Sequence, residues 1–272
     1  MKKNSKLLQL SNECRKDLVK LIFNSKTSHL GSSLSCIDII VSIYFSKFGL
    51  KGSINNKKKL KNTFILSKGH AAPALYVVMN KKGLISDSKL KNYCKPGSYL
   101  EEHPNIKIDG VIVSSGSLGH GLSYSAGISL ADKINNKNFK HIVLMSDGEC
   151  NEGSVWEAGM FIPAKKIENI LVFIDCNKWQ ATERTKDIMA FEPIKKKWQA
   201  FGWFVKEIDG HNFNQIEKCL RDFHLKKKPT VVVCRTTKGK GVSFMEDDNL
   251  WHYRAPNQKE YEKAIKELEK KF

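Results

Sequence analysis

Short runs of consecutive apolar residues, each followed by small or polar residues, recur along the chain. Runs of this length suit strands that are buried on both faces of a parallel sheet. They are FIL at 64–66, VIV at 111–113, HIVLM at 141–145, NILVFI at 169–174 and TVVVC at 230–234. Because a buried parallel sheet needs covering layers on both faces, this feature constrains the fold more than any other.

Apolar residues at helical spacing occupy the segments around these runs. The stripes are Leu18, Leu21 and Ile22; Ile37, Ile40, Val41, Tyr44 and Phe45; Ile216, Cys219, Leu220 and Phe223; and Tyr261, Ile265, Leu268 and Phe272. Strands that alternate with helices predict a doubly wound α/β fold with a mainly parallel sheet flanked by helices. In such folds ligands bind outside the carboxyl ends of the strands.

Composition narrows the class of protein. The chain has 272 residues and a net charge of +18, but its lysines are spread along its whole length, including KKK at 57–59, 195–197 and 226–228. Aromatic residues do not interleave with them as in a base-stacking surface, so a solvated lysine-rich surface is favoured over nucleic-acid binding.

No segment approaches the roughly 20 apolar residues of a membrane helix, and no signal core is found. We therefore expect a soluble, cytoplasmic protein. Its seven cysteines form no C-x-x-C pair, which favours reduced thiols over a zinc site or disulfides.

The segment SDGECNEGSVWEA (146–158) follows the apolar run that ends at residue 145. Asp147 offers a carboxylate, Gly148 lets the backbone approach a phosphate, and a helix beginning near Ser154 points its positive end at the same region. After the next run, Asn177 adds an amide oxygen, and we expect a turn beyond it to add the backbone carbonyl of Trp179. Magnesium prefers about six oxygen ligands and often takes some from phosphates. A D-G pair alone is more often a turn, but the two strand ends together predict a magnesium-held diphosphate.

The same residues carry a resemblance to the transketolase family. SDGECNEGSVWEA followed by IDCNK resembles the thiamine diphosphate motif, a G-D-G opening with an Asn pair about thirty residues later. Ser146 occupies the position of the first glycine, and Cys176 that of the first asparagine. Further blocks are similar to that family in order: TSHLGSSLSCIDI, LSKGHAAPALY, EEHP, SSGSLGHGLSYSAG, IDGHN and FMEDDNLWHYRAP. The resemblance covers nearly the whole chain and implies the diphosphate-binding domain of the thiamine diphosphate-binding fold.

The resemblance also implies residue roles. In its catalytic blocks, His29 and His252 would hydrogen-bond the reacting carbonyl oxygen or the acceptor aldehyde, His70 would lie between diphosphate and substrate, and His103 would hold the terminal hydroxyl of the donor. The cofactor would be bound by His70, Gly116, Leu118, Asp147, Gly148, Glu149 and Asn177. Asp147, Asn177 and Trp179 would bind Mg²⁺, or Ca²⁺ or Mn²⁺ in its place. Glu152 is equally expected at a dimer interface or as an ordinary acid in the first helical turn. His120, His141 and His224 are expected to be structural, and His211 to be either structural or supporting.

The function that the resemblance implies is transfer of a two-carbon ketol group from a ketose phosphate, such as xylulose 5-phosphate, to an aldose phosphate, such as ribose 5-phosphate. Residues 1–272 would form one domain, and the pyrimidine-binding and C-terminal domains would lie on a separate chain, in a heterotetramer that also self-associates through the diphosphate-binding domain. The pathway would be central pentose phosphate metabolism or a specialised sugar pathway. Alternatives are the alpha subunit of a 2-oxo acid dehydrogenase, a 1-deoxyxylulose 5-phosphate synthase, which the 114–127 block disfavours, and a degenerate or regulatory subunit. We expect neither nucleic acid nor a membrane as a partner.

Overall fold

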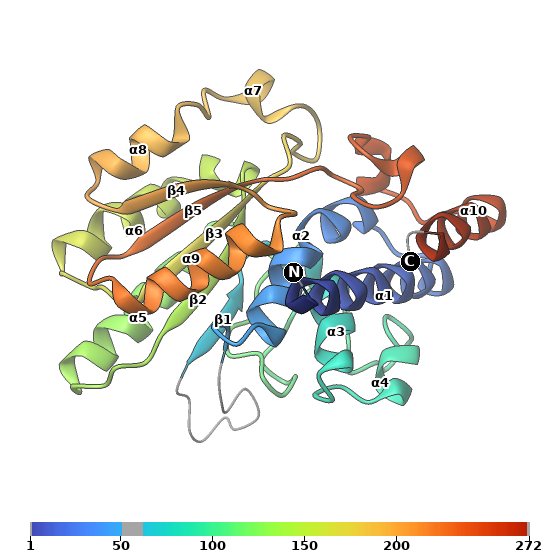
Figure 1. The fold of residues 1–272 in the computed structure, drawn as a ribbon, viewed down its shortest axis with the longest axis horizontal. Helices are drawn as coiled ribbons and strands as arrows, with labels where there is room; N and C mark the ends of the chain where they lie inside the picture. Colours follow the sequence, from blue (N-terminus) through green and yellow to red (C-terminus); the bar gives the residue numbers. More distant parts are fainter. Residues whose placement is uncertain (1, 51–61, 271–272) are drawn as a thin grey trace.

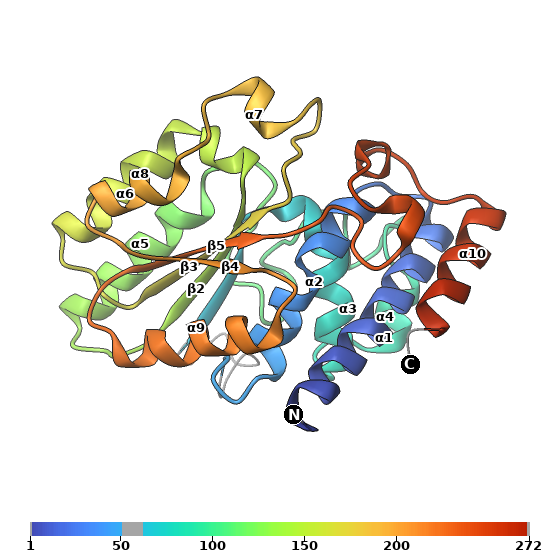
Figure 2. The ribbon, with the colours of Figure 1, turned by 45° about the horizontal axis from the view of Figure 1, so that its top comes forward.

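The computed structural model describes residues 2–50 and 62–270. Five parallel strands of the described chain form one sheet in the order β1-β2-β3-β5-β4. Helices cover both faces of this sheet, and helices α1, α3 and α10 extend the molecule beyond its β1 side (Figures 1 and 2). The predicted doubly wound, parallel α/β class is therefore confirmed.

The strands, helices and 3-10 turns have the following bounds, and the longest stretch between two of them joins α4 to α5. The strands are β1 Thr63–Leu66, β2 His141–Ser146, β3 Ile170–Cys176, β4 Phe204–Asp209 and β5 Thr230–Arg235. The α-helices are α1 Lys2–Ser25, α2 Leu30–Phe45, α3 Ala72–Lys81, α4 Asp87–Lys91, α5 Gly121–Ile134, α6 Gly153–Ala164, α7 Thr185–Ile188, α8 Ile194–Ala200, α9 Phe213–Leu225 and α10 Gln258–Glu269. The 3-10 turns are η1 Gly69–Ala71, η2 Gly148–Asn151, η3 Ser243–Met245 and η4 Asn249–His252.

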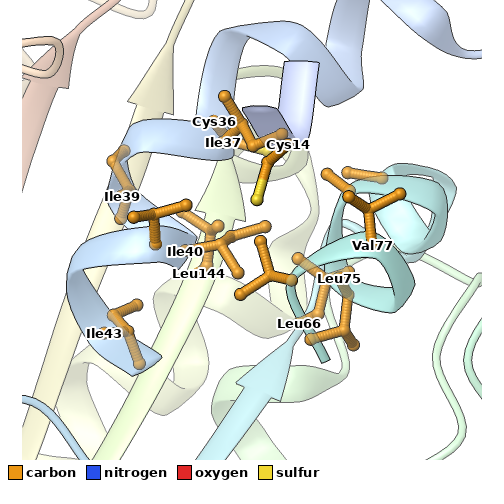
Figure 3. Packing of buried hydrophobic residues seen from close by; sticks show 14 of the residues in the cluster. Cys14, Cys36, Ile37, Ile39, Ile40, Ile43, Leu66, Leu75, Val77 and Leu144 are labelled. Atoms are coloured by element: carbon orange, nitrogen blue, oxygen red, sulfur yellow. The ribbon is translucent and has the colours of Figure 1, made fainter. Parts of the chain in front are cut away.

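Successive residues of the strands face two separate cores. In β2, Ile142 and Leu144 pack with α1, α2, α3 and α9, whereas Val143 and Met145 pack with α5, α6 and α8. This alternation explains why the strands read as continuous apolar runs. Figure 3 shows the first core, where isoleucines of α2 meet Leu66 and Leu144 of the sheet. Helix α2 is buried from Leu30 to Tyr44, so it is packed on nearly all sides, and it anchors the residues that precede it.

The register of the central strands brings the polar residues that follow them to one edge. Ser146 at the end of β2 lies opposite Asp175 in β3, so Asp147 and Asn177 both emerge at the carboxyl edge of the sheet. The helix predicted near Ser154 is α6, which begins at Gly153. The stripes predicted for α1 and α9 are buried as expected, and so is that of α2 except for Phe45, which is partly buried. In α10 Leu268 is buried and Tyr261 and Ile265 are partly buried.

Two expectations about the strands were wrong. The run at 111–113 is not a strand: Val111 packs in the first core while Ile112 and Val113 pack against the second, so the run passes between the two cores as a loop. Strand β4 was missed because it is an edge strand with the sequence FVKEID, whose exposed positions interrupt the apolar pattern. Phe272 and the KKK run at 57–59 lie outside the described residues. Among those described, no helix is long and apolar enough to cross a membrane.

Candidate active site

Asp147 lies buried at the carboxyl end of β2. Its Oδ2 accepts hydrogen bonds from the Lys178 backbone N–H and the Thr185 hydroxyl, both at 2.9 Å, and its Oδ1 accepts the Gly148 N–H at 3.0 Å. At the neighbouring strand end, the Asn177 Oδ1 accepts the N–H of Trp179 at 3.0 Å. The two strand ends therefore bring together the residues that the sequence predicted as metal ligands.

The oxygen atoms available at these strand ends suit a hard metal cation as ligands. In the described part of the chain, no group of three or more His, Cys, Asp or Glu side chains is arranged to hold a metal. An ion here would instead use one carboxylate, an amide oxygen, a backbone carbonyl and the oxygens of a ligand, which is the chemistry that Mg²⁺ accepts. Burial, with the nearby charge of Asp175, raises the pKa of Asp147 to about 6. A divalent cation would offset this cost of burying the carboxylate, so the residues present fit the expected metal.

Asp175 and Lys68 form a buried ion pair beneath the strand ends. The Lys68 Nζ donates to Asp175 Oδ2 and, at 3.1 Å, to the Ser32 carbonyl of α2. Asp175 also accepts hydrogen bonds from Ser35 and from Asn177. Although burial alone raises the pKa of Asp175, the Lys68 charge and the hydrogen bonds from Lys68, Ser35 and Thr236 hold it below its usual range. This pair joins β1, α2 and β3 directly under the candidate site.

Four histidines from separate segments converge beside this pair. The ring centroid of His29 lies 5.0 Å from that of His252, 5.5 Å from that of His70 and 6.2 Å from that of His103, and those of His70 and His252 are 5.7 Å apart. His29 precedes α2 with a left-handed φ of 70°, and its N–H donates to the His252 carbonyl at 2.9 Å. A non-glycine residue in this conformation is uncommon, so its presence here indicates that the surrounding contacts fix it.

The imidazoles of His29, His70 and His252 are neutral near pH 7. Burial lowers the pKa of His29 to about 4 and, with the nearby charge of Lys238, lowers the pKa of His252 to about 3. Burial also lowers the pKa of His70 well below its usual value, with Lys68 adding to the effect. A neutral imidazole has one donor nitrogen and one acceptor nitrogen. The cluster therefore offers both kinds of hydrogen bond to a polar substrate.

The loop at 115–120 borders the histidines. A Cβ at Gly116 would lie 3.1 Å from the His103 ring, so a larger residue would crowd that side chain, and the half-buried Leu118 follows in the same loop. The Glu149 carboxylate is fully buried and accepts from the Ser67 hydroxyl, from Gly119 N–H at 3.0 Å and from Ser146 N–H at 3.3 Å. Its protein partners thus indicate that Glu149 holds this loop.

Lys238 is a site residue that sequence reasoning missed. Its Nζ donates to Asn249 Oδ1 at 2.6 Å and to His252 Nδ1 at 3.1 Å. Burial, together with the nearby Lys68, lowers its pKa to about 7. Lys68 was also missed, although it stands in the quoted block LSKGH. The only local signal is that each of these lysines precedes a glycine, in SKGH and in TTKGKG.

The remaining histidines have other surroundings. His141 bonds Thr63 and Asp132, both at 2.8 Å, and His224 bonds the Phe48 carbonyl at 3.0 Å, whereas His120 is exposed before α5. His211 bonds Asp38 of α2 at 2.8 Å and accepts the Thr237 N–H at 2.9 Å. Because Thr237 precedes Lys238, the contacts of His211 favour a supporting role.

A cavity of about 640 Å³ opens beside Asp147. Basic and apolar side chains line this cavity, among them Lys178, Arg184, Met189 and Arg235. The four clustered histidines are not among its lining residues. Across this region Arg184 stacks on Trp179 at 3.8 Å and pairs with Asp247, to which the Trp179 indole also donates. These contacts fix the turn that carries the Trp179 carbonyl next to Asn177.

The chain is similar to known proteins over nearly its whole length. Residues 9–270 match the model of the family described as "Transketolase, thiamine diphosphate binding domain". The chain is 37% identical over 263 residues to a protein of Phocaeicola vulgatus that is named as one subunit of an apulose-4-phosphate transketolase, covering 96% of this chain and 93% of that protein. It is 33% identical to the "6-deoxy-6-sulfo-D-fructose transketolase subunit SqwG" of Clostridium sp., covering 96% and 95%.

Longer relatives match over part of their length. Human transketolase is 30% identical over 96% of this chain, which spans 42% of that protein. The solved transketolase of Campylobacter jejuni superposes with a TM-score of 0.87 at 24% identity, over 97% of this chain and 43% of that one. At this identity the likeness shows the fold alone.

Proposed function

The chain belongs to the transketolase family, and on that premise we propose that it is the N-terminal, thiamine diphosphate-binding subunit of a transketolase whose other domains lie on a separate chain. The observation that carries the proposal is the meeting of four histidines beside the strand ends that hold Asp147 and Asn177. Such a cluster serves a substrate with several hydroxyl and carbonyl groups. The family match also favours this interpretation over a dehydrogenase alpha subunit or a deoxyxylulose phosphate synthase.

We propose that Asp147, Asn177 and the Trp179 carbonyl hold Mg²⁺, or Ca²⁺ or Mn²⁺ in its place, and that the ion holds the diphosphate. Gly148 lets the backbone come close, since a Cβ there would already lie 2.9 Å from Gln180. Helix α6 directs its positive end toward the same edge of the sheet. When bound, thiamine diphosphate supplies the carbon nucleophile that takes up a two-carbon ketol group.

The histidines would then divide the handling of the substrate. His103 would bind the terminal hydroxyl of the donor, where Gly116 leaves it room and Tyr76 fixes its backbone by donating to the His103 carbonyl at 3.0 Å. His29 and His252 would hydrogen-bond the reacting carbonyl or the acceptor aldehyde. His70, at the end of β1 and next to Lys68, would lie between diphosphate and substrate. Because the rings of His29, His70 and His252 are neutral, each has one nitrogen that can donate to a developing oxyanion and one that can accept a proton.

The substrates would be a ketose phosphate and an aldose phosphate, with xylulose 5-phosphate and ribose 5-phosphate as the first pair to test. Two relatives are named for apulose 4-phosphate and for 6-deoxy-6-sulfo-D-fructose. A specialised sugar pathway is therefore the alternative to central pentose phosphate metabolism.

The partner would be a C-terminal transketolase subunit, because two relatives that this chain matches over nearly their whole length are named as subunits. Residues 1–272 would then act as one domain within a cytoplasmic heterotetramer. Self-association through this domain is supported by the exposed apolar side chains of α5 and α6, namely Tyr124, Ile134, Met160 and Phe161. Gly127, in the middle of α5, has open space around it, and a glycine there costs about 1 kcal/mol relative to alanine. Close packing by a second copy would explain that glycine.

The test is two-carbon transfer from xylulose 5-phosphate to ribose 5-phosphate with thiamine diphosphate and Mg²⁺. The chain is assayed alone and mixed with its candidate C-terminal partner. Activity only in the mixture supports the proposal. A mixture that binds cofactor but transfers nothing redirects the search to other ketoses and acceptors, and a mixture that does not bind cofactor contradicts the proposal.

A further inference from the structure

Sequence analysis predicted no role for Glu102. Its carboxylate hydrogen-bonds Ser28, the residue that precedes His29. Its Oε1 accepts the Ser28 backbone N–H at 3.3 Å and the Ser28 hydroxyl at 3.2 Å. The same hydroxyl oxygen lies 2.9 Å from Nδ1 of His29. A chain of contacts thus runs from the carboxylate through Ser28 to the imidazole.

The number of protons available in these hydrogen bonds determines the tautomer of His29. A carboxylate only accepts hydrogen bonds, and a hydroxyl has one proton to donate. Because a bond to an ionised acceptor is roughly twice as strong as one between neutral groups, that proton goes to Glu102. The Ser28 oxygen then has only lone pairs to offer His29, so the bond at 2.9 Å requires a proton on Nδ1. The neutral ring is left with an unprotonated Nε2.

His252 is held in the opposite way. Its Nδ1 lies 3.1 Å from the Lys238 Nζ, and at a pH below the lowered pKa of Lys238 this group is an ammonium, which has donors but no acceptor. Nδ1 of His252 must therefore accept, which places the proton of the neutral ring on Nε2. Ser32, at 3.2 Å from the same Nδ1, can donate to it as well.

We propose that Glu102, acting through Ser28, and Lys238 hold His29 and His252 in opposite tautomers, so that the two neighbouring rings present one acceptor and one donor. The ring centroids are 5.0 Å apart, so a single substrate can meet both. The hydrogen bonds found for the His29 ring within the described chain all involve Nδ1, which leaves Nε2 for that substrate.

The consequence for catalysis rests on the proposed function. A substrate hydroxyl would give its proton to Nε2 of His29. The Nδ1–H of the resulting imidazolium would still donate to the Ser28 oxygen, close to the negative charge of Glu102. The Nε2–H of His252 would donate to the substrate's carbonyl oxygen. Glu102, Ser28 and Lys238 are thus positioning residues, whereas the two histidines contact substrate.

The tautomers can be measured without any activity. Two-bond ¹H–¹⁵N spectra of the labelled chain at about pH 6, where Lys238 is charged and both rings are neutral, distinguish protonated from unprotonated ring nitrogens. The variants His29→Gln and His252→Gln assign the signals. We expect a protonated Nδ1 in His29 and a protonated Nε2 in His252. Glu102→Ala should move the His29 proton toward Nε2, because the Ser28 hydroxyl is then free to donate to Nδ1. Glu102→Gln should move it less, because its amide oxygen still accepts from Ser28 but carries no charge.

Glu101→Ala is the matched control, since this adjacent exposed acid accepts from Asn105 at 3.3 Å and has no bond to Ser28 or His29. Ser28→Ala provides a second route if Glu102→Ala folds poorly, and it should also release the His29 tautomer. A wild-type His29 protonated on Nε2, or equal spectra for Glu102→Ala and Glu101→Ala, would overturn the inference.

The two-chain enzyme gives a second readout. Glu102→Ala should lower kcat/KM about tenfold or more, the factor that corresponds to one hydrogen bond to a charged group, whereas Glu102→Gln, which keeps an acceptor for Ser28 but not the charge, should lower it less. If the mixture transfers no sugar, the proposed function fails while the spectra still decide the tautomers. If the mixture is active and His29 does not respond to Glu102→Ala, the inference alone fails.

Discussion

Removing the Arg15 charge should destabilise the chain far more than removing an exposed arginine. Arg15 of α1 and Asp38 of α2 are 6% and 3% exposed, and their charged atoms lie 2.6 Å apart. Arg15→Met leaves a buried carboxylate without its main cation, a change that typically costs about 3–5 kcal/mol. The side chain also loses its bond to the Lys240 carbonyl at 3.0 Å, so the loop that carries Lys238 loses a support.

Urea unfolding at pH 7, followed by tryptophan fluorescence, measures this free energy. Arg221→Met is the control, because Arg221 is exposed and its contact with Asp222 is 3.4 Å, which predicts a loss of less than about 0.5 kcal/mol. The double variant Arg15→Met with Asp38→Leu should be less destabilised than Arg15→Met, since both charges are gone. Equal losses for Arg15→Met and Arg221→Met, or no recovery in the double variant, would refute this account of the pair.

Three further predictions concern the metal site, the donor site and acid stability. Asp147→Ala should abolish Mg²⁺-dependent binding of thiamine diphosphate because it removes the charged ligand, and undiminished binding by calorimetry would exclude that ligand. His103→Ala in the two-chain enzyme should raise KM for the ketose donor while the cofactor Kd stays within about twofold, the reverse pattern being incompatible with a donor role. Burial alone would raise the pKa of Asp38, but Arg15 holds it well below its usual range, so its contribution to stability is present above about pH 4 and lost as pH falls toward the folded pKa. Asp38→Asn, although destabilised at pH 7, should therefore lose less further stability between about pH 4 and pH 2 than the wild type, and identical acid profiles would contradict this.

The sequence predicted the parts of the fold that depend on local pattern. Four of the five apolar runs are strands, because a strand buried on both faces must be apolar at consecutive positions. The edge strand β4 is partly exposed, so it lacks such a run. The run at 111–113 is apolar at consecutive positions because it passes between the two cores as a loop. Asp147 and Asn177 could be predicted together because parallel strands end at the same edge of a sheet.

The histidine cluster could be expected only through the family resemblance, because nothing in the spacing of the four histidines along the chain brings them together. The supporting residues escaped prediction for a related reason. Lys68 bonds Asp175, which is 107 positions away, and Glu102 bonds Ser28, which is 74 positions away. Lys238 reaches the histidines through a loop that folds back on itself. Such contacts depend on the path of loops, which carries no periodic signal.

The pairing of Ser146 with Asp175 limits how this protein can be altered by insertion. Successive side chains of a strand point to opposite faces, so one extra residue within β2 would turn Asp147 away from Asn177 and exchange the two cores beneath it. An extra residue at the amino end of the strand, before His141, could be absorbed in the 135–140 connection without moving the paired end. Insertions at the two places should therefore differ sharply. One residue inserted before His141 should leave the site intact, whereas one residue inserted within β2 should destroy it.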